Sequence, residues 1–236
     1  MCSSYPFLAS AIVNYSVDVE KDFAQLLSIS DTAQVNLDLN GDFTVEAWIK
    51  PETIEFNQPM DIVSKFGAAD PGYSFSISGT PGALQVVFVD AAGNASQFET
   101  DPVITTPGEW RHVAVVTDVS VPSARFFVDG EEVPVTLIAY NAATSINNSG
   151  APFRIGTRGG NSFYFDGLID DVRVWDSART QKQIQKSMAG KLTGNQNRLV
   201  GNWTFDDQTF NDSSMYGNHL VPETAGPAIE FSTDVH

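Results

Sequence analysis

The chain has 236 residues, and its 13 lysines and arginines against 29 aspartates and glutamates give a net charge of −16. Hydrophobic residues make up 42% of the chain and charged residues 18%, which can fill a core and excludes a disordered acidic tail. A surface of this charge repels the phosphates of nucleic acids and anionic membranes, so nucleic acid is excluded as a partner. Cations, neutral sugars or a basic protein surface are favoured instead.

The cysteine content and the first residues bound the redox chemistry and the targeting. Cys2 is the one cysteine, so no intrachain disulfide forms and the fold depends on packing or metal. The start of the chain has no basic segment, and Pro6 interrupts its apolar run, so no signal peptide is expected in this chain. No stretch approaches the roughly 18 apolar residues that span a bilayer, so membrane insertion is not expected.

Short apolar runs separated by turn dipeptides such as Asn40-Gly41 and Asp129-Gly130 are the main structural signal. They predict strands at 25–30, 42–50, 61–66, 73–78, 84–89, 110–117, 124–128, 153–155, 168–175 and 200–205. In the second of these, apolar residues alternate with polar ones until Trp48, which indicates that the outer face is also partly covered. This many short strands predict an all-β sandwich.

One helix is predicted near 181–189. Thr180 is the expected N-cap, and Thr180 with Gln183 has the spacing of a capping box. Ile184 and Met188 lie four residues apart on one face, and Gly190 is expected to end the helix.

Four segments, in this order and spacing, resemble the laminin G-like and pentraxin-like branch of the concanavalin A-like lectin/glucanase superfamily. They are 41–51 (GDFTVEAWIKP), 108–118 with 126–130 (GEWRHVAVVTD, FFVDG), 153–156 with 165–175 (FRIG, FDGLIDDVRVW) and 203–207 with 212–218 (WTFDD, DSSMYGN). The resemblance covers roughly residues 16–220 and implies a two-sheet antiparallel jelly-roll β-sandwich. We expect a single domain at 16–236, preceded by an arm or edge segment at 1–15.

The resemblance also implies a structural Ca²⁺ between an early acidic loop and the late 212–218 segment. Asp212 matches the position of a ligand, with Asn218 and backbone carbonyls nearby, and calcium prefers such oxygen donors. Asp171 and Asp22 are weaker candidates. Two alternatives stay open: Asp212 and Asn218 cap turns, or Lys21, in the altered early loop, replaces the cation by pairing with the same carboxylates.

Catalysis is not expected. Hydrolytic members of the superfamily carry a Glu-x-Asp-x-Glu array, which this chain lacks. Asp166 and Asp170 are the nearest substitute, but four strand residues separate their Cα atoms by ~13 Å, more than the roughly 5–9.5 Å between glycosidase carboxyls. Asp170 and Asp171 are neighbours and are predicted to point to opposite faces of a strand. The three histidines have no zinc-ligand spacing, and His112 is interpreted as structural.

Aromatic and amide side chains in loops are the candidates for ligand binding. All four tryptophans lie in strand motifs and are interpreted as core residues. Loop aromatics can stack on a sugar and amides can bind its hydroxyls, and the candidates are Tyr140, Asn141, Asn147, Phe163 and Tyr216. The alternative for the 140–149 loop is a polar loop with one anchoring tyrosine.

These observations favour a non-catalytic lectin-like or adhesion domain that binds a glycan or a protein surface, located extracellularly, on a cell surface or on a virion. The alternative is a structural or decoration protein of a virion or surface assembly, as a homo-oligomer or larger assembly. A glycoside hydrolase is the least favoured reading. The apolar segment 1–13 is expected to complete the sandwich edge or to dock on another subunit.

Overall fold

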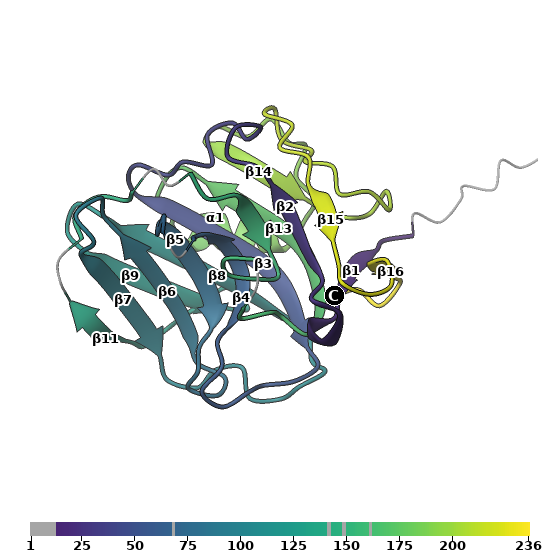
Figure 1. Ribbon diagram of the computed structural model, residues 1–236, viewed down its shortest axis with the longest axis horizontal. Helices are drawn as coiled ribbons and strands as arrows, with labels where there is room; N and C mark the ends of the chain where they lie inside the picture. The colour runs from purple at the N-terminus through teal and green to yellow at the C-terminus, as the bar shows by residue number, and fades with distance from the viewer. Residues whose placement is uncertain (1–12, 68, 141–142, 148–149, 161) are drawn as a thin grey trace, which may run out of the picture.

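Two β-sheets packed face to face form the protein in the computed structural model, which describes residues 13–67, 69–140, 143–147, 150–160 and 162–236 (Figure 1). Each sheet has eight strands among these residues, and every pairing between them is antiparallel. The two-sheet sandwich expected from the sequence is therefore confirmed. Residues 1–12 of the expected arm lie outside the described residues.

Sheet A carries the features on which the candidate site depends. Its strands in spatial order are β10 (Glu131–Val133), β9 (Ser123–Val128), β8 (Arg111–Asp118), β3 (Phe43–Pro51), β13 (Gly167–Trp175), β1 (Ser16–Val19) and β16 (Glu230–Ser232), and β14 (Leu199–Trp203) pairs with β13. The first and last described strands, β1 and β16, pair with each other, so both ends of the described chain meet at one edge (Figure 1).

Sheet B forms the second layer. Its order is β11 (Val135–Tyr140), β7 (Ala95–Thr100), β6 (Leu84–Val89), β5 (Tyr73–Ile77), β4 (Met60–Lys65), β12 (Phe153–Ile155), β2 (Leu26–Ile29) and β15 (Val221–Glu223). Aromatic side chains from the two inner faces meet in the core. The rings of Phe43 and Tyr73 lie 5.3 Å apart, and those of Phe153 and Trp203 5.2 Å apart. Burial of such side chains is the main favourable term in folding.

Helix α1 (Gln181–Met188) covers part of the outer face of sheet A. Thr180 and Gln183 form the predicted capping box. Ile184 is buried on the outer face of the sheet, in one hydrophobic cluster with Ala114, Val116 and Phe127. The covered outer face indicated by Trp48 is thus confirmed.

A buried polar network fixes this helix to the sheet. Glu46 is fully buried, and its carboxylate accepts hydrogen bonds from Trp175 Nε1 at 2.9 Å and from Ser187 Oγ of α1 at 2.8 Å. Burial alone would raise the pKa of Glu46, but His112, whose Nε2 lies 3.4 Å from Oε2, and Arg173 outweigh burial and lower it. His112 is fully buried in this network, and its structural role stays an interpretation.

The ten predicted strands occur with ends shifted by at most two residues, while β1, β7, β10, β11, β15 and β16 are additional. Trp175 and Trp203 are core residues as predicted. Trp48 and Trp110 are only partly buried, on the outer face of sheet A. No helix among the described residues is both long and apolar enough to cross a membrane.

Candidate functional site

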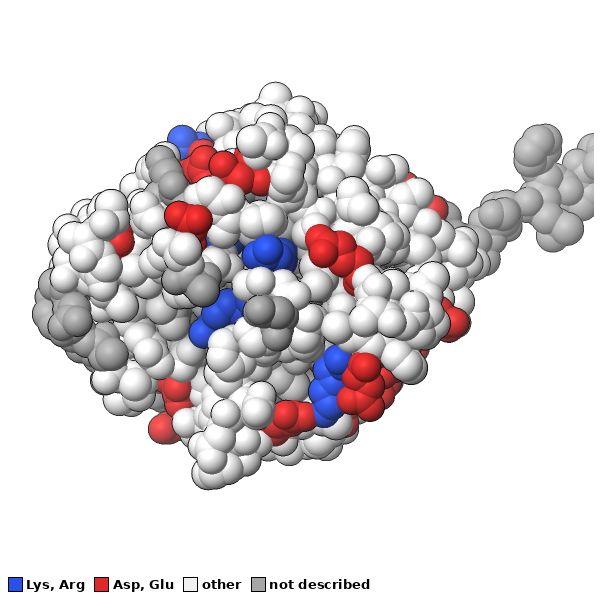
Figure 2. Space-filling model, viewed as in Figure 1, with Lys and Arg blue, Asp and Glu red and all other residues white. Residues whose placement is uncertain are grey.

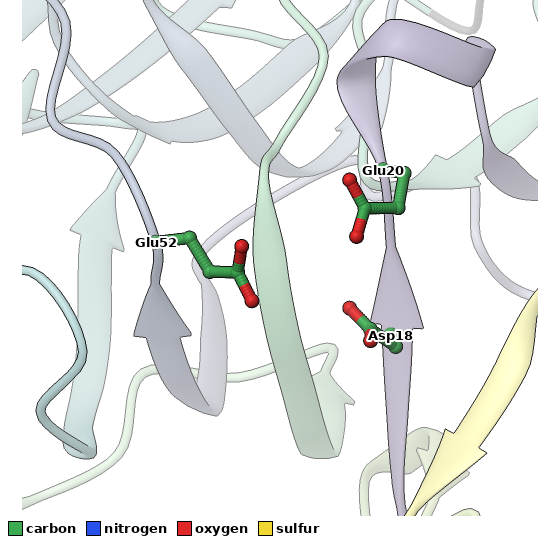
Figure 3. A group of neighbouring side chains, drawn as sticks. All are labelled: Asp18, Glu20 and Glu52. Carbon is green, nitrogen blue, oxygen red and sulfur yellow. The ribbon is translucent and has the colours of Figure 1, made fainter.

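Three carboxylates meet at the edge of sheet A where β1 and β16 pair. Asp18 lies on β1, Glu20 directly follows that strand, and Glu52 directly follows β3. One oxygen of each lies within 4.8 Å of the other two, and the side chains point toward one another across β13 (Figure 3). Sheet pairing explains the meeting, because β13 lies between β3 and β1. We call these three residues the acidic cluster.

The acidic cluster holds more negative charge than its surroundings neutralise. Burial, followed by the charges of Glu52, Glu230 and Asp166, raises the pKa of Asp18. Burial and the same kind of repulsion, led by Asp18, raise the pKa of Glu20. The Oδ1 atom of Asp18 is buried and accepts no hydrogen bond from the described part of the chain. An unsatisfied buried carboxylate oxygen facing two further carboxylates fits a divalent cation, and these hard oxygen donors are the ligands that Ca²⁺ prefers.

The C-terminal strand forms one wall of this cluster. Glu230 of β16 is the register partner of Asp18. A cavity of about 230 Å³ opens here, and it is lined by Asp18, Glu20, Phe23, Gln25, Pro227, Ala228 and Glu230. Removing β16 would therefore expose one side of the acidic cluster.

Lys21 adjoins the cluster and pairs with other carboxylates. Its Nζ forms an ion pair with Glu55 and lies 3.6 Å from Asp166 Oδ2. Both partners lie in loops that flank β3 and β13. Among the described ion pairs Lys21 thus contacts Glu55 and Asp166 and not Asp212, and the acidic cluster is left without a basic partner.

A second cavity, of about 450 Å³, lies next to Lys21 and contains two residues proposed from the sequence, Asp22 and Phe163. It is lined by Lys21, Asp22, Glu55, Gln58, Pro59, Ser162, Phe163 and Tyr164. We call it the Phe163 pocket. Lys21 contacts Glu55 in this pocket and Asp166 near the acidic cluster, and so links the two features.

The Phe163 ring is held rigidly at this pocket. Its backbone has φ +56, a conformation that is rare for a bulky residue, and its carbonyl accepts a hydrogen bond from the Asp61 N–H at 2.9 Å. The Arg158 guanidinium lies 4.9 Å from the ring centroid and 5.6 Å from that of Phe66. Arg158 is itself fixed by two 2.9 Å hydrogen bonds to the buried Asp61 carboxylate. Strained, rigidly supported residues of this kind cluster at functional sites.

The late loop proposed as a calcium site has a different arrangement. The Asp212 carboxylate is buried and accepts four hydrogen bonds, from the backbone N–H groups of Asn202, Ser214 and Asn218 and from Ser214 Oγ, at 2.6–2.8 Å. The Asn218 amide accepts from the Val35 N–H and donates to two carbonyls. These are the contacts of the turn-capping alternative. Metal binding by Asp212 and Asn218 stays a prediction.

Asp171 lies away from both features, and the expectation that it points opposite to Asp170 is wrong. Asp171 has φ +48 at a register irregularity between β13 and β3, and this irregularity disrupts strand alternation. Both carboxylates therefore lie 3.6 Å from Nε2 of His236. The Asp171 carboxylate also pairs with Arg173 Nη2 at 2.7 Å. Its metal role stays a prediction.

The other ligand candidates are tied to the protein itself or fall outside the description. The Asn147 amide donates to the Pro71 carbonyl at 3.0 Å. Tyr216 packs partly buried against the core. Tyr140 ends strand β11, and Asn141 lies outside the described residues. A ligand role for these four residues stays a prediction.

A third cavity, of about 570 Å³, is polar and was not expected from the sequence. Loop 36–42, residues 176–178 and Arg198 line it. Arg198 is paired with Asp176 at 2.9 Å. Acidic side chains form several separate groups on the face drawn in Figure 2, whereas basic side chains are few, so the acidic groups on this face do not form a single patch.

The family to which the chain belongs is shown by comparison with known proteins. Residues 26–185 match the family model described as the concanavalin A-like lectin/glucanases superfamily, which is more than half of the chain. The chain belongs to this superfamily. The laminin G-like resemblance and the sandwich fold are both confirmed.

Individual relatives of this superfamily member are distant. A protein of Bacteroides ovatus ATCC 8483 that is proposed to bind carbohydrate has 20% identity and a TM-score of 0.65, over 93% of this chain and 60% of that one. A heptameric pentraxin from Limulus polyphemus has 15% identity and a TM-score of 0.45, over 76% and 83%. Adhesion G-protein coupled receptor V1 of Danio rerio is 23% identical over 61% of this chain, which spans only 2% of that receptor.

Asp166 and Asp170, the two carboxyls considered for a hydrolytic role, lie on different parts of the described structure. Asp166 accepts a hydrogen bond from Thr53 Oγ1 at 2.8 Å beside Lys21. Asp170 faces His236 in a separate cavity. The two carboxyls therefore lie in different surroundings.

Proposed function

We propose that the protein is a non-catalytic recognition domain that binds a glycan in the Phe163 pocket, with Ca²⁺ at the adjoining acidic cluster. The observation that carries the proposal is the rigid Phe163 ring beside an open polar cavity. An aromatic ring whose position is fixed before binding loses little conformational entropy when a ligand stacks on it. The Bacteroides ovatus relative, itself proposed to bind carbohydrate, supports this class of ligand.

The lining of the pocket suits a neutral or basic sugar. A sugar presents an apolar C–H face, which an aromatic ring can cover, and a rim of hydroxyls, which need hydrogen-bonding groups. Gln58, Tyr164 and the carboxylates of Asp22 and Glu55 supply donors and acceptors around Phe163. The net charge of −16 disfavours sialylated or sulfated ligands.

Calcium bound at the acidic cluster would affect the Phe163 pocket indirectly, through Lys21. The carboxylates of Asp18, Glu20 and Glu52 would hold the ion, which supplies positive charge that relieves their mutual repulsion. Lys21 links this edge to the pocket through Asp166 and Glu55. We expect the ion to stabilise the loops that carry Lys21 and Asp22.

The proposal includes a location outside the cell, on an exterior surface. The named adhesion receptor supports it, as a distant relative over 61% of this chain.

A panel of immobilised glycans, probed with and without calcium, tests the proposal. We expect Phe163→Ala to reduce affinity for a bound glycan by about tenfold or more, since stacked aromatics contribute on the order of 1.4 kcal/mol or more. Phe56→Ala is the matched control, because Phe56 is 72% exposed and does not line the pocket.

Two results would contradict the glycan-binding part of the proposal. One is the absence of binding to every glycan in the panel, which would favour a role in an assembly. The other is equal loss of affinity in Phe163→Ala and Phe56→Ala. A release of reducing sugar from a bound oligosaccharide would contradict its non-catalytic part.

A further inference from the structure

His236 lies on the outer face of sheet A, where its imidazole ring is enclosed by two tryptophan side chains. Its imidazole stacks on the Trp48 indole, with ring centroids 4.1 Å apart and ring planes only 5° from parallel. Trp110 approaches the same imidazole edge-on, at 6.1 Å and 74°. The imidazole is mostly covered, with 23% of the side chain exposed. Two aromatic groups thus enclose a third.

The register of three strands builds the floor of this His236 site. Trp48 of β3 is the direct partner of His112 on β8 and of Asp170 on β13. His112 contacts the Trp48 ring edge-on, with ring centroids 5.4 Å apart, and helps to fix the position of the indole. A ring fixed in this way presents a preformed surface for a flat partner.

Two carboxylates complete the His236 site. His236 Nε2 lies 3.6 Å from Oδ2 of Asp170 and 3.6 Å from Oδ2 of Asp171. Burial, followed by the charge of Asp171, raises the pKa of Asp170 to about 8. Among the described residues, His236 is the one basic side chain within 4.0 Å of the Asp170 carboxylate. The imidazole therefore lies next to a buried carboxyl that no other described basic side chain approaches within 4.0 Å.

The other charged side chains around the His236 ring are paired with one another. Asp171 is also paired with Arg173 at 2.7 Å, and Lys191 is paired with Asp206. These residues, apart from Arg173, line a cavity of about 280 Å³ beside the imidazole, together with Asn14, Asp170, Met188, Ala189, Gly190 and His236. The other titratable ring that contacts the Trp48 indole is His112, which lies beside Glu46, among the described ring contacts.

The segment that leads to His236 is tied down at a second point. Asp234 accepts hydrogen bonds from Lys50 Nζ and from Trp110 Nε1, the latter at 2.9 Å, and its carbonyl accepts one from Ser16 Oγ at 2.8 Å. β16 itself is only three residues long and lies at the edge of the sheet. Such a short edge strand needs contacts beyond its own ladder to stay in place.

We propose that Trp48, Trp110, Asp170 and Asp171 form a receptor for an imidazole ring, and that His236 in this receptor latches the C-terminal strand β16 onto sheet A. The latch has a consequence for the acidic cluster, because Glu230 of β16 stands beside Asp18. Its release frees the strand that walls one side of that cluster. The receptor does not depend on the proposed glycan function.

Amide hydrogen exchange and proton NMR on the full chain test the latch. In the wild type we expect the His236 ring protons to be displaced upfield by the stacked indole. In His236→Ala we expect exchange at Glu230–Ser232 to accelerate by about tenfold or more, while exchange in the core strand β3 is unchanged. His219→Ala assigns the imidazole signals and serves as the control, because His219 Nδ1 contacts only the 212 loop among the described hydrogen bonds.

Free imidazole tests the receptor itself. We expect it to quench tryptophan fluorescence in His236→Ala, where the receptor is open, and to have a much smaller effect on the wild type. Asp170→Asn combined with His236→Ala should weaken that binding. Unshifted His236 protons, unchanged exchange in β16, or equal quenching of wild type and His236→Ala would each overturn the proposal. The substitutions at His236 leave the core untouched, so a folding failure does not obscure these outcomes.

Discussion

Arg158 and the buried carboxylate of Asp61 form two hydrogen bonds of 2.9 Å, although 97 residues separate them in the chain. The pair supports Phe163 in two ways, because Arg158 contacts the ring and the Asp61 N–H binds the Phe163 carbonyl. Burial raises the pKa of Asp61 to about 6, against the lowering effect of Arg158. The positioning of the aromatic ring therefore depends on an ion pair in the protein interior.

Arg158→Met is expected to destabilise the protein by about 3–5 kcal/mol, because it leaves the Asp61 carboxylate buried and unpaired. We expect a smaller loss for Arg158→Lys, which keeps the charge but not the forked geometry. Urea denaturation measures both changes. The double variant Arg158→Met with Asp61→Leu should recover much of the stability, and a loss equal to that of Arg158→Met alone would show that the ion pair is not the cause.

Calcium is expected to stabilise the wild type more at neutral than at acidic pH. The folded-state pKa values of Asp18 and Glu20 lie above their ordinary 3.8 and 4.5. Without the ion, their contribution to stability therefore falls as the pH rises through these values, since the folded state must ionise groups that repel one another. Calorimetry at both pH values, with calcium and with chelator, measures the difference.

Asp18→Asn is the variant that decides where calcium acts. It keeps the shape of the side chain, removes one charge and should abolish most of the calcium-dependent rise in melting temperature. An undiminished calcium response in Asp18→Asn would exclude the acidic cluster as the metal site. A response lost only in variants of the 212–218 loop would instead support the site implied by the family resemblance.

Asp212→Ala is expected to lower the free energy of unfolding by about 3 kcal/mol or more, whether or not calcium is present. The substitution leaves three buried backbone N–H groups without an acceptor, and each unsatisfied group is unfavourable by about 1–3 kcal/mol. Guanidinium denaturation with calcium and with chelator separates the roles. If Asp212 is a metal ligand, its loss should instead erase the difference between the two conditions.

Sequence patterns predicted the central strands because short runs of valine, isoleucine and phenylalanine, separated by turn residues, are typical of β-strands. The short strands β1, β10, β15 and β16 were not predicted, since each has only three or four residues. Their pairing depends on neighbours that the local sequence does not contain. The capping box of α1 was predictable because all of its atoms lie within four residues.

The candidate site was predictable only in part, for a similar reason. Phe163 was identified as a loop aromatic, but its support from Arg158 and Asp61 comes from other elements. The acidic cluster was missed, although Asp18 and Glu20 alternate with buried Val17 and Val19, a pattern that places both acids on one face. Glu52 joins them only through the order of the strands. Alternation failed at Asp171, where its φ of +48 turns the carboxylate to the side of Asp170.

Gly194→Ala is expected to destabilise the protein by about 2 kcal/mol or more. Gly194 has φ +82, and a Cβ atom there would lie 1.7 Å from the carbonyl oxygen of Ser213, so the backbone of the 212–218 loop would have to move. Gly190→Ala is the matched control, because no atom lies within 4 Å of the added Cβ. Thermal unfolding of the two variants compares them directly, and equal melting temperatures would contradict the crowding at Gly194.

Asp170→Asn is expected to change how the stability of the protein depends on pH. The folded-state pKa of Asp170 is raised to about 8, first by burial and then by the charge of Asp171. Its contribution to stability is therefore complete below its ordinary value of 3.8 and is lost as the pH rises toward 8, where the buried group ionises. Asparagine has no such transition and still accepts the hydrogen bond from the Asp171 N–H.

Each unit of raised pKa corresponds to about 1.4 kcal/mol. We expect Asp170→Asn to gain at least about 2 kcal/mol relative to the wild type between about pH 5 and about pH 9. Urea denaturation across this range measures the gain, with Asp207→Asn as the control because Asp207 is exposed. If both variants follow the wild-type pH dependence, the Asp170 carboxyl is not kept protonated by its surroundings.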